Sequence, residues 1–223
     1  MNKLNFKEGV KFLYFGSLCE LCLMGLAFIM GFLDLIVGEI EIFTGIMSIL
    51  ILLAYLAALV LKLLGALKAR KEETNLTYAF YTIIGVLALS AINMILNMAA
   101  YNKYVNGIIS IIVGVGELAF MYFIIVGISN VFKSQGNNEI VEYAKKALYI
   151  ILGAAGLAFL LNSVNCFLNY GTAMGVIDVI ATACSIVAVV FMFLFLKKSL
   201  AELSTNNQAE VQASEAKEEA VEE

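Results

Sequence analysis

The chain has 223 residues, of which 62% are apolar and 14% are charged, and its net charge is −4. A soluble domain has about half apolar and roughly a quarter charged residues, so one water-soluble core cannot hide this much apolar surface. The charge balance offers no basic face for phosphates, which argues against nucleic-acid binding.

Six apolar segments follow one another along the chain. About 20 residues cross the ~30 Å hydrocarbon layer as a helix, and lipid offers no partner for unpaired backbone groups. We therefore predict an all-α membrane protein. Its transmembrane domain covers residues 1–200, with helices at about 12–33, 42–64, 76–99, 105–131, 147–168 and 172–196.

Three features flank these segments. The first segment follows several lysines, but it is too long for the apolar part of a secretory signal and no A-x-A site follows, so we expect it to be retained. Asn138 is a candidate N-cap for the helix that leads into 147–168. Residues 201–223 are rich in Glu, Ala and Gln and have no aromatics, which predicts a disordered acidic cytoplasmic tail.

The positive charges predict the orientation. If the six segments alternate in direction, every Lys and Arg except Lys103 lies on the side of the N-terminus. Because basic residues stay on the cytoplasmic side, we expect a multi-pass protein of the cell membrane with both termini cytoplasmic. Lys62, near the inner end of the second segment, is expected to reach the headgroups with its long stem.

The segments also show internal similarity. The second and fourth segments align at an offset of 62 residues, which places Gly45 on Gly107, and the second and third hairpins align at an offset of 68, which places Asn97 on Asn165. We interpret this as a probable internal triplication into three parallel helical hairpins around an axis along the membrane normal. Chance similarity among apolar helices is the alternative.

A polar stripe recurs in this alignment at helical spacing. It gives candidate cavity or ion-binding residues on the even-numbered segments, to which the carboxylate of the first segment is added: Glu20, Ser48, Tyr55, Ser110, Glu117, Asp178, Thr182 and Ser185. Such stripes also serve as packing seams between helices, and this alternative stays open.

Two carboxylates make the cavity interpretation attractive. Glu20 and Glu117 fall near the bilayer centre, where an ionised group costs several kcal/mol. We expect no Lys or Arg at that depth, so each is predicted to be protonated, hydrated or bound to a cation. A neutral Glu with one structural hydrogen bond is the alternative.

Amides and thiols give weaker signals. Asn93, Asn97, Asn162 and Asn165 are secondary candidates for a solute-binding lining, although amides in membranes more often link helices. The pair Cys19 and Cys22 beside Glu20 could bind a soft metal together with Cys184, but small apolar fillers are the favoured interpretation.

Missing residue types and motifs exclude several classes of enzyme. The chain has no His, which excludes Ser–His and Cys–His nucleophiles, and intramembrane protease motifs are absent, so we expect no enzyme and no cofactor. We predict a small-solute or proton- or cation-linked transporter or channel with a polar central cavity. A non-catalytic accessory or scaffold subunit of a membrane complex is the alternative, and the expected partners are the lipid bilayer, a small solute, proton or cation, or another membrane protein.

Overall fold

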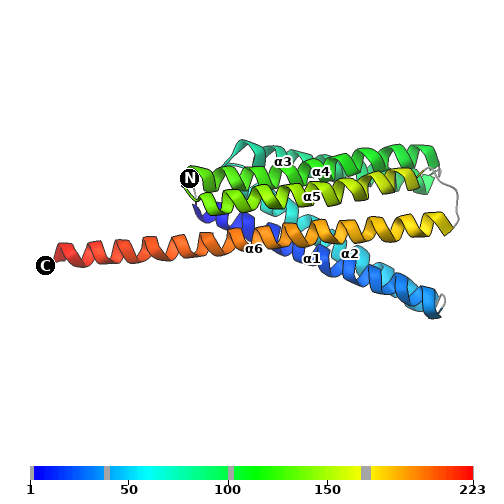
Figure 1. The fold of residues 1–223 in the computed structure, drawn as a ribbon, viewed down its shortest axis with the longest axis horizontal. Coiled ribbons are helices and arrows are strands. Elements are labelled where there is room, and N and C mark those ends of the chain that lie inside the picture. The colour runs from blue at the N-terminus through cyan, green and yellow to red at the C-terminus, as the bar shows by residue number, and fades with distance from the viewer. Residues whose placement is uncertain (1–2, 38–40, 100–102, 167–171, 223) are drawn as a thin grey trace.

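A computed structural model shows a bundle of six α-helices (Figure 1). It describes residues 3–37, 41–99, 103–166 and 172–222, and no strand occurs in these ranges. The helices are α1 (Lys3–Val37), α2 (Glu41–Ala69), α3 (Thr74–Ala99), α4 (Lys103–Ser134), α5 (Asn138–Asn165) and α6 (Thr172–Glu222). The predicted all-α class is therefore confirmed.

Five of these helices contain stretches long and apolar enough to cross a membrane, among the residues whose placement is described. They are Asn5–Leu26, Thr74–Asn93, Tyr104–Ser134, Asn138–Asn165 and Val176–Thr205. The remaining predicted span, 42–64, is helical within α2, but part of it lies outside the described side chains. The helices extend beyond the predicted spans because polar residues at membrane surfaces can continue a helix into water.

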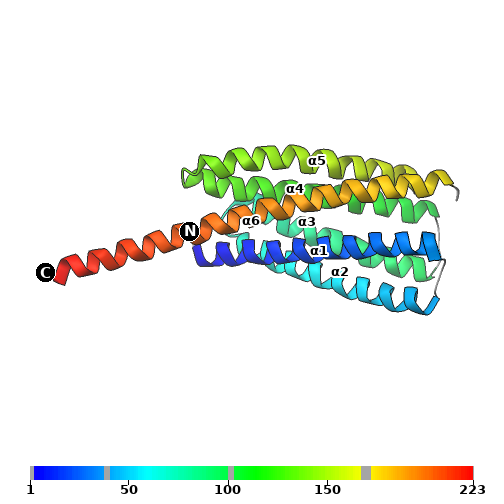
Figure 2. The ribbon, with the colours of Figure 1, turned by 60° about the horizontal axis from the view of Figure 1, so that its bottom comes forward.

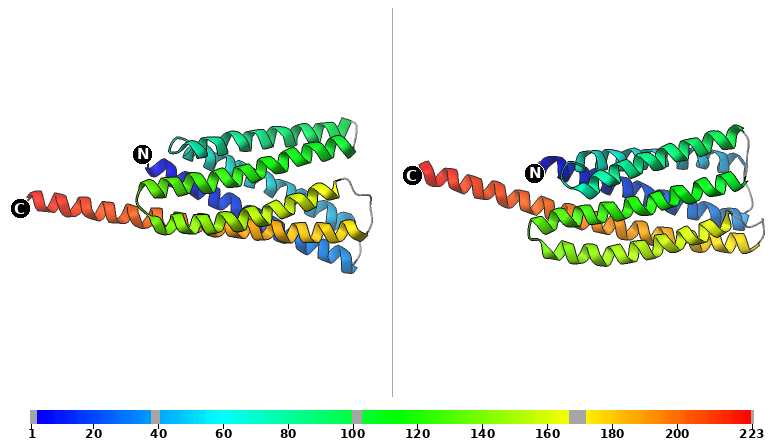
Figure 3. Two further views of the ribbon diagram at one scale, coloured as in Figure 1. Left: turned by 45° about the horizontal axis from the view of Figure 1, so that its top comes forward. Right: turned by 90° about the horizontal axis from the view of Figure 1, so that it is seen from above.

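The helices form a closed ring in chain order. The hairpin pairs α1–α2, α3–α4 and α5–α6 have the most extensive contacts, α2–α3 and α4–α5 join them, and α6 packs on α1 (Figures 2 and 3). Stacked rings of Tyr14 on α1 and Phe193 on α6, with centroids 4.9 Å apart, help to close the ring. Both termini lie at the same end of the bundle (Figure 1), called here the terminal end.

The tightly packed core occupies the half of the bundle nearest the terminal end. Its largest fully buried side chains include Phe6, Leu76, Phe132, Ile140 and Phe195, one from each of five helices. On the outer surface, large apolar side chains such as Tyr81, Ile95 and Leu160 are exposed. An apolar exterior of this kind suits a lipid environment.

The loops at the terminal end are fixed by side-chain caps. The Glu73 carboxylate accepts a hydrogen bond from the backbone N–H of Asn75 at 2.6 Å and another from the side chain of Asn130 at 3.1 Å. The N-cap of α5 is Asn137, whose Oδ1 accepts from the Ile140 N–H at 3.2 Å, so the prediction of Asn138 was wrong by one residue. Gly136, with φ of +77°, turns the chain after α4, which leaves Asn137 non-helical and free to cap.

The chain beyond residue 200 continues as part of α6. Leu203 is buried in the core, so the bundle extends past the predicted boundary, and the backbone then projects away from the bundle as a helix to Glu222 (Figure 2). A single helix in water is marginally stable without packing partners. Disorder of this tail in solution stays a prediction.

Candidate functional site

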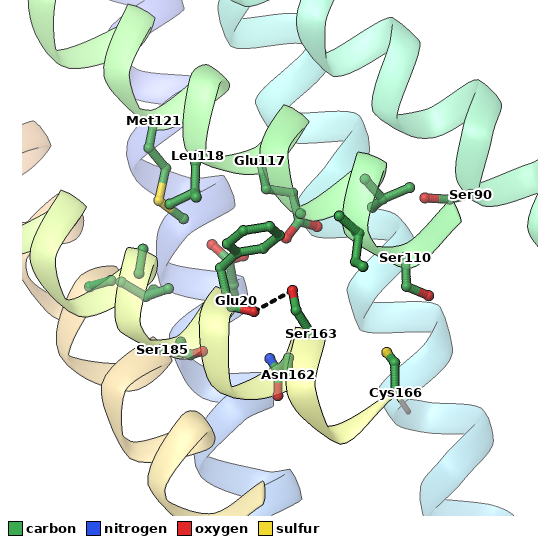
Figure 4. Close-up of a pocket in the computed structure, with 18 of the residues that line it drawn as sticks. Glu20, Ser90, Ser110, Glu117, Leu118, Met121, Asn162, Ser163, Cys166 and Ser185 are labelled. Atoms are coloured by element: carbon green, nitrogen blue, oxygen red, sulfur yellow. Dashed lines mark hydrogen bonds between the residues drawn. The ribbon is translucent and has the colours of Figure 1, made fainter. Parts of the chain in front are cut away.

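A cavity of about 340 Å³ lies inside the ring, between α1, α3, α4, α5 and α6. This volume is at the lower end of the range of ligand sites, about 300–1,000 Å³. Eight of its lining residues are polar or charged: Glu20, Ser90, Asn93, Ser110, Glu117, Asn162, Ser163 and Ser185. Figure 4 shows Glu20 and Glu117 reaching this space from α1 and α4.

The cavity belongs to the half of the bundle away from the termini. Its lining begins at Cys166, which follows the last residue of α5, and it reaches Met121 on α4 and Val189 on α6. The packed core lies beyond these residues towards the terminal end. The bundle is therefore hollow in one half and filled in the other.

Glu20, at the deep end of the cavity, is paired with a lysine. The Lys62 Nζ lies 2.5 Å from Glu20 Oε2, and the two side chains are only 11% and 18% exposed. The prediction that no Lys or Arg reaches this carboxylate, and that Lys62 extends to the headgroups, was wrong. The reason is the packing of α1 on α2, which brings residues 42 positions apart in sequence into contact.

Small residues make that close packing possible. A Cβ on Gly16 would lie 2.9 Å from Lys62 Cγ, and a Cβ on Gly65 would lie 2.8 Å from the carbonyl oxygen of Gly9. In α1 the residues of this face, Gly9, Leu13, Gly16 and Glu20, follow at steps of 4, 3 and 4, as one helical face requires. Because glycines let the two backbones approach, the stem of Lys62 can cross Gly16 and reach Glu20 one turn further on.

Apolar side chains close the bundle on the terminal side of the ion pair. Phe120, Ile124, Met192 and Leu196 surround a void of about 10 Å³ that also touches Ser17, Glu20 and Lys62. Such a void holds about one water at most. The deep end of the cavity is thus a barrier made of an ion pair backed by a packed apolar layer.

Glu117 differs from Glu20 because no ion pair or hydrogen bond holds its carboxylate among the described residues. Its side chain is exposed to the cavity. Ser110, Gly114 and Glu117 share one face of α4. Gly114 makes room for the neighbouring α5, since a Cβ there would lie 2.7 Å from Cδ2 of Phe159.

The structure brings together some of the predicted site residues. Glu20, Ser110, Glu117 and Ser185 all line the cavity, and so do the secondary candidates Asn93 and Asn162 (Figure 4). The dashed line in that view is the 2.8 Å hydrogen bond that the Ser163 hydroxyl donates to the backbone carbonyl of Phe159.

Other predicted site residues lie elsewhere. Tyr55 and Thr182 do not line the cavity, and Tyr55 is 38% exposed on α2. The face of α2 that carries Tyr55 also carries Lys62, and Tyr55 is near enough to Glu20 and Glu117 to interact with them electrostatically. The side chains of Ser48 and Asn97 lie outside the described residues.

Two asparagines link the helices of a hairpin. The Asn93 side-chain amide donates to Asn106 Oδ1 at 2.7 Å, which joins α3 to α4, and the Asn165 amide donates to Asp178 Oδ1, which joins α5 to α6. Asn165 and Asp178 are thereby held outside the cavity. These contacts agree with the helix-linking interpretation of the amides.

Several lining residues were not predicted. Ser90, Ser163 and Cys166 gave no signal beyond being single small polar residues in apolar helices, whereas Lys62 was visible as a charge inside a predicted span. The cysteines are free, and within the described ranges no three His, Cys, Asp or Glu side chains gather as metal ligands. Cys19, Cys22 and Cys184 therefore do not form the metal site considered from the sequence.

Comparisons with models of protein families, with curated proteins and with solved structures find no match. We therefore infer the function from the chemistry of the cavity itself.

Proposed function

We propose that this chain is a multi-pass protein of the cell membrane that binds a small polar solute in its central cavity and carries it across, linked to a proton or cation through Glu117. One observation carries this proposal: the Glu117 carboxylate, which has no hydrogen bond or ion pair among the described residues, faces the polar cavity inside the bundle. Because an uncompensated carboxylate inside a membrane is costly, it is retained where it serves a substrate or ion pathway.

The architecture supports a carrier open on one side. The cavity occupies one half of the bundle, and the apolar layer at Phe120, Ile124, Met192 and Leu196 fills the other. We propose that both termini are cytoplasmic, as the lysine and arginine distribution indicates, so that the cavity belongs to the outer half. Transport then requires this layer to open in a second conformation while the outer half closes.

The three hairpins give this motion plausible rigid units. We propose that they are diverged repeats. The second and third hairpins each have an amide link, Asn93–Asn106 and Asn165–Asp178, but the aligned positions of the second link are Asn97 and Ser110, one helical turn from the first link. In both links the paired residues are separated by 13 positions, so each joins the two helices of its hairpin in the same way. The contacts between α2 and α3 are the least extensive of the ring, which makes that junction a suitable place for movement.

The test is solute uptake into proteoliposomes with and without a proton or sodium gradient. We expect Glu117→Gln to lose uptake while it keeps its expression level and its elution volume in detergent. Glu139→Gln is the matched control, because it removes an equal charge from the exposed surface at the terminal end, where Glu139 pairs with Lys198 at 2.8 Å. Absence of uptake by the unmodified protein over a broad solute panel would contradict the proposal.

A non-catalytic accessory subunit is the second candidate. It is favoured by the part of α6 that projects beyond the bundle to Glu222, where it could meet a partner (Figure 1). Stoichiometric co-purification with one larger membrane complex, lost when residues 206–223 are removed, would support this role. Co-purification that survives this truncation would contradict the proposed use of the helix.

A further inference from the structure

The charges around the cavity do not cancel, and their sum indicates the ligand. We infer that the cavity takes a small organic monocation that also carries hydrogen-bonding groups, with its ammonium group at Glu117; this inference deepens the proposed function and rests on its cavity. Neither the sequence pattern nor the fold alone specifies such a ligand. Three properties of the cavity lead to it: charge, lining and size.

The first property is charge. Lys62 lies 2.5 Å from Glu20, so these two opposite charges compensate each other at the deep end. Glu117 remains, and when it is ionised it gives the cavity one net negative charge. An ionised Glu117 repels an anion and is compensated by a single positive charge, whereas with a neutral solute it has to take up a proton instead.

The second property is the lining. The hydroxyls of Ser110 and Ser185 and the amide of Asn162 offer both donors and acceptors to a ligand. The Phe159 ring also lines the cavity and lies against Gly114, one turn before Glu117, and an aromatic ring attracts an ammonium group placed over its face. This combination suits an amine or quaternary amine that carries hydroxyl groups.

The third property is size. A cavity of about 340 Å³ exceeds the volume of a bare metal ion many times, and a liquid water occupies about 30 Å³. Hard cations are bound by several oxygen ligands, usually with more than one carboxylate. No group of three acidic, His or Cys side chains that could hold a metal ion is found among the described residues. An organic cation therefore matches this space better than an inorganic one.

Isosteric ligands test the charge preference on the unmodified protein. Serinol and glycerol differ by an ammonium in place of a hydroxyl, and choline and 3,3-dimethylbutan-1-ol differ by nitrogen in place of carbon. Titration calorimetry with purified full-length protein in detergent should show saturable binding of serinol or choline in the millimolar range or tighter. The neutral partner of the binding pair, and the anion glycerate, should bind at least tenfold more weakly.

A variant locates the ammonium group. Glu117→Gln should weaken binding of the cation roughly ten- to hundredfold, the range that follows from loss of one charged hydrogen bond. Glu139→Gln should leave the dissociation constant unchanged. Equal weakening by both variants would place the ammonium elsewhere and overturn the assignment.

The outcomes separate this inference from the proposed function. Equal binding of the charged and the neutral ligand of a pair, or no binding of either cation, would overturn the inference that the ligand is a monocation. Uptake of a neutral or anionic solute by proteoliposomes would support transport and contradict a monocationic ligand. Selective binding of a monocation without its uptake would support the monocationic ligand and contradict transport.

Discussion

The ion pair between Glu20 and Lys62 should contribute measurably to the stability of the bundle. The pair is 2.5 Å long, and its side chains are 11% and 18% exposed. Removing one partner of a buried pair costs about 3–5 kcal/mol, because the other charge is left uncompensated. The cavity lets water reach Glu20, which reduces this cost. We therefore expect Lys62→Met to lower the free energy of unfolding by about 2–3 kcal/mol.

A double-mutant cycle isolates the interaction itself. Lys62→Met keeps most of the stem that packs across Gly16, and Glu20→Gln keeps the shape of the carboxylate. The double variant removes both charges of the pair, so it should be less destabilised than the sum of the single variants, with a coupling energy of about 1–3 kcal/mol. The free energy of unfolding can be measured by SDS titration in mixed micelles, followed by circular dichroism.

The chain offers a matched control for this cycle. Lys68 and Glu8 also join α2 to α1, but their side chains are 37% and 43% exposed. Because exposed pairs are screened and solvated, their coupling energy should be much smaller than that of the buried pair. A coupling energy for Glu20 and Lys62 no larger than that of the exposed pair would refute the argument that burial makes this interaction strong.

Three further predictions concern packing, cavity size and capping. Gly65→Ala should lower the free energy of unfolding by about 1–3 kcal/mol, since its Cβ would lie 2.8 Å from facing backbone and force α1 and α2 apart; SDS titration measures this. Gly114→Ala should displace the Phe159 ring, 2.7 Å from the new Cβ, and weaken binding of the cation with little loss of stability, measured by calorimetry. Asn137→Ala should cost about 1 kcal/mol of unfolding free energy, because the N-cap of α5 is lost.

Gly85→Ala is the control for both glycine variants, because a Cβ there meets nothing within 4 Å. It should be neutral or stabilise α3 by about 0.5–1 kcal/mol. Equal stability of the Gly65 and Gly85 variants would contradict the close approach of α1 and α2. An unchanged dissociation constant in the Gly114 variant would contradict the position given to the Phe159 ring, and an Asn137 variant as stable as Asn138→Ala would contradict the assigned cap.

The sequence by itself determined the all-α class of the fold and indicated a membrane as the environment of the chain. Apolar stretches of about 20 residues are a local property of the chain, and lipid forces them into helices. The sequence also marked Glu20 and Glu117 as exceptional, because any carboxylate inside such a stretch is visible without knowing its neighbours. Both residues line the cavity in the structure.

The tertiary structure decided what these carboxylates meet. Lys62 pairs with Glu20 only because Gly16 lets α1 and α2 approach closely, and no pattern within either helix shows this. The rotation of each helix about its own axis was also undetermined, which is why Tyr55, one residue of the predicted stripe, does not line the cavity. In a membrane the lipid-facing and protein-facing sides are both apolar, so hydrophobic pattern alone does not distinguish them, and packing between helices settles the choice.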